Sequence, residues 1–275
     1  MTAGAIGSDP AELLDLATRL ARESGRLLVE ASRHRLDRLA LVDTARRKSS
    51  TTDLATEADR ASEQLIVGAI KKARPTDAVL GEEGSEHGGT SGLTWIIDPI
   101  DGTTNFVYDF GTWAVSIGVA DGDGSLAGAV FDPLRDEMFT AVRGAGAFVD
   151  GRRLGPVDAV ALDESLIGTG FSYAAENRRN QARLLPVVLP RVRDIRRAGA
   201  ASLDLCYVGA GRLNGYYESG LHPWDRAAGL LVATEAGAGF RDVEGLDPRR
   251  STLVVAPPGL LEELLALLVE AAARR

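Results

Sequence analysis

Residues 93–110 read LTWIIDPIDGTTNFVYDF, and the rest of the chain can be interpreted outward from this stretch. An apolar, β-prone run at 95–97 leads directly into Asp98. Such a run is typical of a buried strand in an α/β protein, where functional sites form at the ends of strands. The sequence therefore places the first acidic side chain of interest at the tip of a strand.

Two carboxylates flank Pro99 in this stretch. Proline favours an extended residue before it and interrupts strand pairing, so we expect the strand to stop at Asp98 and the chain to bend before Asp101. Two close carboxylates repel each other unless one takes up a proton or a cation binds between them, and a divalent metal ion is the natural solution. Gly102 permits an unusual backbone conformation, and donors at 103–105 could bind a phosphate oxygen at a helix start.

A polar turn is the simpler interpretation of D-P-I-D-G-T, because Asp, Pro and Gly are common turn residues. Further acids that could converge on it favour a functional site. Glu82 follows a short predicted strand at 78–80, although two glutamates in a surface turn are normally solvated. Asp59 lies near the apolar side of a predicted helix, and Asp225 lies in the first turn of another that begins at Pro223; complementation of the helix dipole is the ordinary explanation for both.

Composition narrows the class of protein. The chain has 275 residues, 45% of them hydrophobic and 25% charged, which suits a globular protein with a substantial core. Its 31 basic and 39 acidic residues give a net charge of −8, which argues against a general nucleic-acid surface. A single cysteine, Cys206, fits a reducing compartment, and neither an export signal nor a membrane-spanning run is evident, so we expect a cytoplasmic protein.

The remaining elements follow from hydrophobic periodicity and turn residues. Helices are expected at 10–31, from about 57 to 74, at 199–211, 223–237 and 259–273, and short strands at 113–120, 127–132, 137–142, 147–149, 166–170, 251–256 and up to Glu218. The four strands between 113 and 149 read as a meander. The small residues 227–229 would let their helix approach a neighbour closely, which could bring Asp225 against the central loop.

Three motifs together resemble the inositol monophosphatases of the magnesium-dependent, lithium-sensitive phosphatase family. They are G-E-E at 81–83, D-P-I-D-G-T at 98–103 and W-D-R-A-A-G at 224–229, and the likeness extends from about residue 48 to the end of the chain. The resemblance implies an α/β fold, the αβαβα five-layer sandwich of that family. It implies one domain over 1–275, with an N-terminal half to about 155 and a C-terminal half from about 156, and a homodimer.

The resemblance also implies roles for individual residues. One Mg²⁺ would be bound by Glu82, Asp98 and the carbonyl of Ile100, a second by Asp98, Asp101 and Asp225, and a third, weaker ion through water on Glu82. Thr103 and Glu82 would orient the attacking water, with the acid Asp59 nearby. The residues expected to contact the substrate are Asp101, Gly102, Thr103, Ala201, Glu218 and Asp225. An all-oxygen ligand set of this kind selects hard cations over zinc.

The implied activity is Mg²⁺-dependent hydrolysis of inositol 1-phosphate by a metal-activated water. Other sugar or polyol phosphates, such as fructose 1,6-bisphosphate or histidinol phosphate, remain alternatives. A non-catalytic protein that works with RNA or the transcription machinery is another, because R-V-R-D-I-R-R at 191–197 is the one dense basic run. One departure stands out: the family often has Gly-Ser-Ala or Gly-Thr-Ala where this chain has Gly199-Ala200-Ala201, so any role of that hydroxyl is in doubt. His222 is expected to be solvated or structural, with leaving-group protonation as the alternative.

Overall fold

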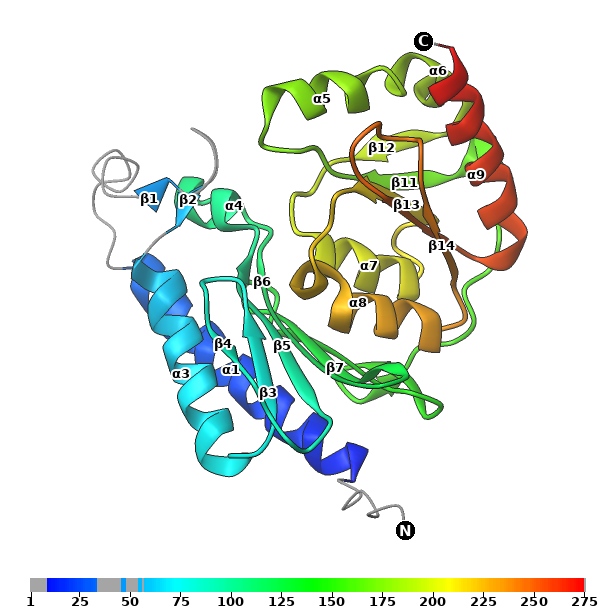
Figure 1. The fold of residues 1–275 in the computed structure, drawn as a ribbon. Helices are drawn as coiled ribbons and strands as arrows, with labels where there is room; N and C mark the ends of the chain where they lie inside the picture. Colours follow the sequence, from blue (N-terminus) through cyan, green and yellow to red (C-terminus); the bar gives the residue numbers. More distant parts are fainter. Residues whose placement is uncertain (1–8, 34–45, 48–53, 56, 275) are drawn as a thin grey trace.

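The computed structural model describes residues 9–33, 46–47, 54–55 and 57–274. Helix α1 (Pro10–Arg33) begins as predicted, because the Asp9 carboxylate accepts a hydrogen bond of 3.0 Å from the Ala11 N–H. Helix α3 (Glu57–Ala73) lies beside α1, and together they form the first layer of the molecule (Figure 1). The expected bounds of both helices are confirmed to within two residues or so.

The second layer is an eight-stranded sheet in the order β10-β9-β8-β7-β6-β5-β3-β4. Only β3 and β5 pair in parallel, and the predicted meander is confirmed as the antiparallel run β6 to β9. The strands are β3 (Ala78–Gly81), β4 (Glu86–His87), β5 (Thr94–Asp101), β6 (Ala114–Asp121), β7 (Gly124–Asp132), β8 (Glu137–Val142), β9 (Gly146–Val149) and β10 (Arg152–Arg153). A separate pair joins β1 (Arg46–Arg47) to β2 (Leu54–Ala55).

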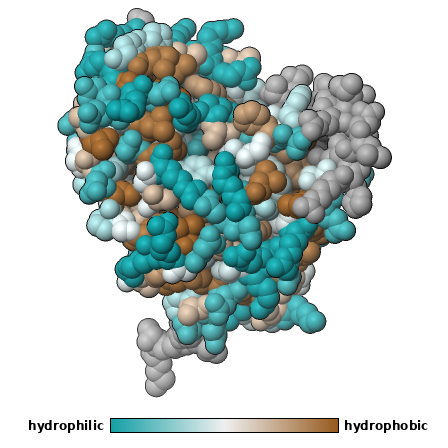
Figure 2. Space-filling view, turned by 180° about the vertical axis from the view of Figure 1, so that it is seen from behind, coloured by the Kyte–Doolittle hydropathy of each residue, from teal (hydrophilic) through white to brown (hydrophobic). Residues whose placement is uncertain are grey.

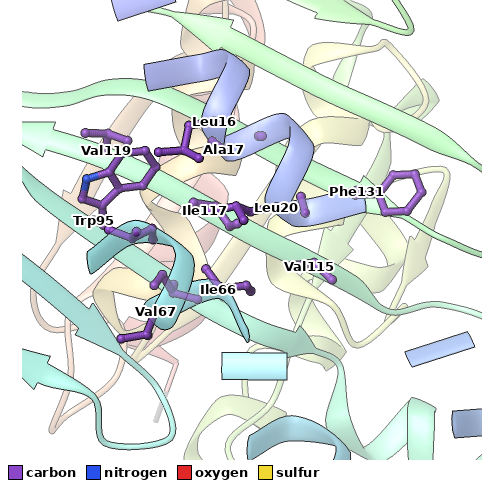
Figure 3. Packing of buried hydrophobic residues seen from close by; sticks show 14 of the residues in the cluster. Leu16, Ala17, Leu20, Ile66, Val67, Trp95, Val115, Ile117, Val119 and Phe131 are labelled. Carbon is purple, nitrogen blue, oxygen red and sulfur yellow. The ribbon is translucent and has the colours of Figure 1, made fainter. Parts of the chain in front are cut away.

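Apolar side chains fill the space between the first two layers. Leu16, Ala17 and Leu20 of α1 face Val115, Ile117 and other side chains of the sheet, as Figure 3 shows. Trp95, the largest of the fully buried side chains, belongs to β5 in the same cluster. This packing fixes the start of β5, and therefore the position of the acids at its other end.

The C-terminal half contributes the other three layers. Its five-stranded sheet has the order β12-β11-β13-β15-β14, with helices on both faces (Figure 1). Its strands are β11 (Leu166–Thr169), β12 (Asp194–Arg196), β13 (Gly215–Ser219), β14 (Gly239–Val243) and β15 (Thr252–Ala256). The helices, with two 3₁₀ turns, are η1 (Leu162–Glu164), α5 (Ala175–Ala182), α6 (Leu185–Val188), η2 (Leu189–Arg191), α7 (Ala201–Gly209), α8 (Pro223–Glu235) and α9 (Pro258–Ala273).

Helices α7 and α8 form the middle layer, between the two sheets (Figure 1). Close approach depends on small residues, as predicted for 227–229. A Cβ on Gly118 of β6 would lie 2.8 Å from the Cβ of Ala227, and one on Gly128 of β7 would lie 2.9 Å from the Cα of Ala228. The order of layers is therefore α, β, α, β, α, and the predicted fold class is confirmed.

The surface is mostly hydrophilic on the face seen in Figure 2, with hydrophobic residues in separate patches. In the part of the chain that the structure describes, we find no helix with the length and apolar character needed to cross a membrane.

Candidate active site

A cavity of about 360 Å³ contains nearly all the residues that the sequence singled out. It is lined by side chains from both halves of the chain. The predicted site residues among its walls are Glu82, Asp98, Ile100, Asp101, Gly102, Thr103, Ala201, Glu218 and Asp225. Asp59 is fully buried and is not among the residues that line the cavity.

Strand β5 does not stop at Asp98, so that prediction is wrong. The strand continues through Pro99 to Asp101. In its pairing with β6, Asp98 faces Ser116 and Asp101 faces Ala114, so three steps along β5 match two along β6. This is a β-bulge, which absorbs the missing N–H of Pro99 and turns the strand locally. The predicted change of direction between the two acids is therefore present as a bulge inside the strand.

The bulge places Asp98 in a cluster of acids. Its side chain is 2% exposed, and its Oδ1 atom has no hydrogen-bond partner. Burial is the main cause that raises the pKa of Asp98 well above its ordinary value, and the charges of Glu82, Asp101 and Asp225 raise it further. The side chain of Glu82 also lies within hydrogen-bond reach of Asp98, and this too raises the pKa of Asp98.

A hard divalent cation fits this arrangement. It would bind the Asp98 oxygen that has no hydrogen-bond partner and neutralise the acids whose charges raise the pKa of Asp98. Within the described ranges, no three His, Cys, Asp or Glu side chains lie close enough together to form a finished ligand set.

Gly102 and Thr103 form the turn after the bulge. Gly102 has a φ of 96°, a left-handed conformation that favours glycine, and a Cβ there would lie 3.0 Å from the Thr112 carbonyl oxygen. Helix α4 (Thr103–Tyr108) then begins, as the sequence predicted. The Thr103 hydroxyl donates to the Ile100 carbonyl oxygen at 3.0 Å. That oxygen keeps one lone pair, so it can still serve as a metal ligand.

Asp101 connects the bulge to the C-terminal half. Its Oδ1 accepts the Ala201 N–H at 3.1 Å, and its Oδ2 accepts the Ser202 N–H at 2.7 Å and the Ser202 hydroxyl at 2.5 Å. Burial raises the pKa of Asp101 to about 6, although the hydrogen bonds from Ser202 act in the opposite direction. The Ala201 N–H, which we expected to be available to a substrate, is therefore engaged by Asp101.

Asp225 lies in the first turn of α8, as predicted. Its Oδ2 accepts the His222 backbone N–H at 2.5 Å. Burial is the main cause that raises its pKa well above the ordinary value, and the Asp101 charge adds to this. The His222 ring stacks on Trp224, with 4.9 Å between ring centroids and 8° between planes. His222 thus has the structural contact that we expected, at the edge of the cavity.

Glu218 of β13 also lines the cavity. The Tyr216 hydroxyl donates to its Oε2 at 2.5 Å, and a Cβ on Gly170 would overlap its carboxylate. Burial raises the pKa of Glu218 to about 7, while the hydrogen bond from Tyr216 and the charge of Arg197 lower it. A partly buried, oriented carboxylate of this kind suits the hydroxyl groups of a polyol.

Glu63 is a site-supporting residue that the sequence did not reveal. It is 3% exposed, and its carboxylate accepts the N–H of Glu83 at 2.8 Å and that of Ser85 at 3.1 Å, so it holds the turn that carries Glu82. Gly81 leaves room for it, because a Cβ there would overlap the Glu63 carboxylate. The sequence feature that could have revealed Glu63 is its position four residues after Asp59, which places both side chains on the same face of α3. Arg197 and Arg250 also line the cavity, and the sequence did not predict that they would.

Comparisons with known proteins show the family of this chain. The model of the Inositol monophosphatase family matches residues 9–274. The chain is 42% identical to the Inositol-1-monophosphatase SuhB of Mycobacterium tuberculosis (strain ATCC 25618 / H37Rv), over 95% of this chain and 94% of the relative. It is also 42% identical to the Nus factor SuhB of Pseudomonas aeruginosa, over 85% of this chain and 86% of the relative.

A solved structure is similar to this chain in three dimensions as well. The crystal structure of the extragenic suppressor protein suhB from Bartonella henselae superposes with a TM-score of 0.84, at 34% identity, and covers 94% of this chain and 98% of that one. The family resemblance seen in the sequence is confirmed, and the chain belongs to the inositol monophosphatase family.

Proposed function

We propose that this protein is a Mg²⁺-dependent phosphatase that hydrolyses inositol 1-phosphate. The observation that supports it most is the convergence of Glu82, Asp98, Asp101 and Asp225 on one cavity, where Asp98 has a buried oxygen without a partner. Asp98 and Asp101 are buried and Glu82 and Asp225 are partly buried, so four carboxylates in one cavity are costly unless a cation neutralises them. A fold that serves only as a binding surface has no need of this arrangement.

The metal-binding side of the cavity would be built by residues of the N-terminal half with Asp225. Glu82, Asp98 and the Ile100 carbonyl would hold one Mg²⁺, and Asp98, Asp101 and Asp225 a second. Bound Mg²⁺ supplies charge neutralisation of the phosphoryl group and activation of the attacking water. Thr103 and Glu82 would orient that water, while Gly102, without a side chain, leaves the turn open to the phosphate oxygens. Asp59, which is buried and does not line the cavity, would support the metal-binding side.

The polyol side would be formed by the C-terminal half. Glu218 can accept hydrogen bonds from ring hydroxyls, and its own orientation is fixed by Tyr216 at 2.5 Å. Arg197 and Arg250 supply positive charge at the walls of the same cavity. A polyol monophosphate matches this division into one end that binds cations and one that binds hydroxyls.

Phosphate release across a panel of substrates tests the proposal. We expect release from inositol 1-phosphate with Mg²⁺, none with EDTA, and slower release from fructose 1,6-bisphosphate and histidinol phosphate. Phosphate release from only one of those two compounds would make that compound the substrate, and the proposed type of reaction would stand. No release from any of them with Mg²⁺ would remove the proposed activity.

A role with RNA or the transcription machinery is the alternative, and it gains little from the arginine run. Arg191 is paired with Glu270 at 3.4 Å and Arg196 with Asp194 at 2.5 Å, while Arg197 lines the cavity. The run is therefore not one free basic surface. On the family likeness we also propose a homodimer, which sedimentation of the purified protein would test.

A further inference from the structure

Helix α7 begins without a capping side chain of its own. Its N-cap residue, Ala200, makes no side-chain hydrogen bond, and its methyl group packs in an apolar cluster with Leu203 and Cys206. The N–H groups at a helix start need acceptors. Here they are satisfied by Asp101, about 100 residues earlier in the chain, whose carboxylate accepts from Ala201 and Ser202.

Ser202 makes a second bond to the same carboxylate oxygen. Its backbone N–H reaches Oδ2 of Asp101 at 2.7 Å, and its hydroxyl reaches the same atom at 2.5 Å. A carboxylate oxygen has two lone pairs, so Ser202 uses both lone pairs of Oδ2. Oδ1 accepts only the Ala201 N–H at 3.1 Å and keeps one lone pair.

We propose that Ser202 is a positioning residue for the metal site: its hydroxyl fixes the Asp101 carboxylate so that Oδ1, and not Oδ2, is presented to a divalent cation. The inference rests on the proposed function, because it assumes that Asp101 is a metal ligand. Ser202 would thus supply a hydroxyl group beside Asp101, although Ala200, where the family often has a hydroxyl residue, has none. The Ser202 hydroxyl reaches the carboxylate from inside the helix, two residues after the cap.

The surroundings hold Ser202 in one place. Its side chain is fully buried, so water does not compete for the hydroxyl. Helix α8 packs directly on it, since a Cβ on Gly229 would lie 2.6 Å from the Ser202 carbonyl oxygen. On the other side, the Asn105 side-chain amide donates to the Ala198 carbonyl oxygen at 2.8 Å and to that of Thr112 at 2.6 Å, which ties α4 to the start of α7. A rigid donor of this kind can orient a ligand with little loss of entropy.

Calorimetric titration of metal-free protein with Mg²⁺ tests the inference without measuring catalysis. We expect Ser202→Ala to bind Mg²⁺ roughly 10-fold to 100-fold more weakly than the unaltered protein, the usual range for losing a group that orients a metal ligand. Ser165→Ala is the matched control. It also removes a buried serine hydroxyl, which donates to the Ala161 carbonyl oxygen at 2.8 Å, and Ser165 does not line the cavity, so its Mg²⁺ affinity should not change.

Unchanged Mg²⁺ affinity in Ser202→Ala, with a lower melting temperature, would overturn the inference, since Ser202 would then only stabilise α7. An equal loss of affinity in Ser165→Ala would overturn it as well. If the alanine variant does not fold, Ser202→Cys, which keeps a weak donor, should still bind Mg²⁺ more weakly than the unaltered protein. Failure of the unaltered protein to bind Mg²⁺ would instead remove the proposed function, and this inference with it.

Discussion

The two halves of the molecule contribute acids to the cavity in different ways. In the N-terminal half, Glu82, Asp98 and Asp101 lie within 20 residues of sequence, at the ends of the neighbouring parallel strands β3 and β5. In the C-terminal half, Glu218 comes from β13 and Asp225, seven residues later, from the first turn of α8. The first group is assembled by the pairing of two strands and the second by the turn from a strand into a helix, and packing of the layers brings the two groups together.

This difference suggests a division of work. The pKa of Asp98 is raised by burial and then by three other carboxylates, and no positive charge is among its main influences. The pKa of Glu218 is also raised by burial, but a tyrosine hydroxyl and the Arg197 charge act against it. A region of unbalanced negative charge suits cations, whereas a balanced, hydrogen-bonded carboxylate suits neutral hydroxyls.

Among the variants that test the difference between the two halves, Asp98→Asn should have the largest effect on activity. It removes a shared metal ligand, so we expect phosphate release from inositol 1-phosphate to fall by roughly 1,000-fold or more, since metal ions supply several kcal/mol to such reactions. It also removes one of several mutually repelling acids. In EDTA, the free energy of unfolding should therefore rise by roughly 1–3 kcal/mol, measured by urea denaturation.

Asp77→Asn is the control for this change. Asp77 is also buried, but although burial raises its pKa, the hydrogen bonds from Arg74 and Trp95 outweigh that effect and its pKa is lowered. The variant should lose roughly 1–3 kcal/mol of unfolding free energy and keep its activity. An active Asp98→Asn variant, or one that is as destabilised as Asp77→Asn, would mean that the acids of the N-terminal half do not form a cation site.

Glu218→Gln tests the other side of the comparison. It removes the carboxylate that would accept substrate hydroxyls, so kcat/KM for inositol 1-phosphate should fall roughly tenfold. For p-nitrophenyl phosphate, which has no ring hydroxyls, kcat/KM should change little, and Mg²⁺ affinity should stay the same. Equal losses with both substrates would show that Glu218 serves the reaction centre and not the polyol.

Much of the N-terminal half could be predicted from the sequence because its signals are local. The cap at Asp9 and the apolar stripe gave α1, and the alternation of short apolar runs with turns gave the meander. The motif at 98–103 predicted a site because an apolar strand leads into two acids. The prediction that Pro99 ends the strand was wrong because a bulge absorbs the proline, and that depends on the partner strand β6.

Other features had no local signal. Strands β12 and β14 were missed because they are short, polar and mostly exposed, and they are stabilised by pairing with β11 and β15. Glu63 resembles a surface helix residue until the turn at 81–85 is placed beside it. Ser202 became informative only when the fold brought it to Asp101, a separation of 101 residues. Such contacts are set by tertiary packing.

The stability of the metal-free protein should depend on pH. Burial raises the pKa of Asp101 from 3.8 to about 6 and that of Glu218 from 4.5 to about 7, so the folded state holds protons that the unfolded state has released. These groups therefore lower the free energy of unfolding as the pH rises through this window, and we expect a decline of up to about 4 kcal/mol between about pH 5 and about pH 8 in EDTA.

Urea denaturation at a series of pH values measures this decline, and two changes should separate its sources in the two halves. Saturating Mg²⁺ should remove the part that comes from Asp101, because the ion binds the ionised acids and not the protonated ones. Glu218→Gln should remove the part near pH 7 and leave the lower part in place. Stability that does not change with pH across this window in EDTA would mean that both carboxyl groups titrate at their ordinary pKa values, and that the charge contrast between the two halves does not exist.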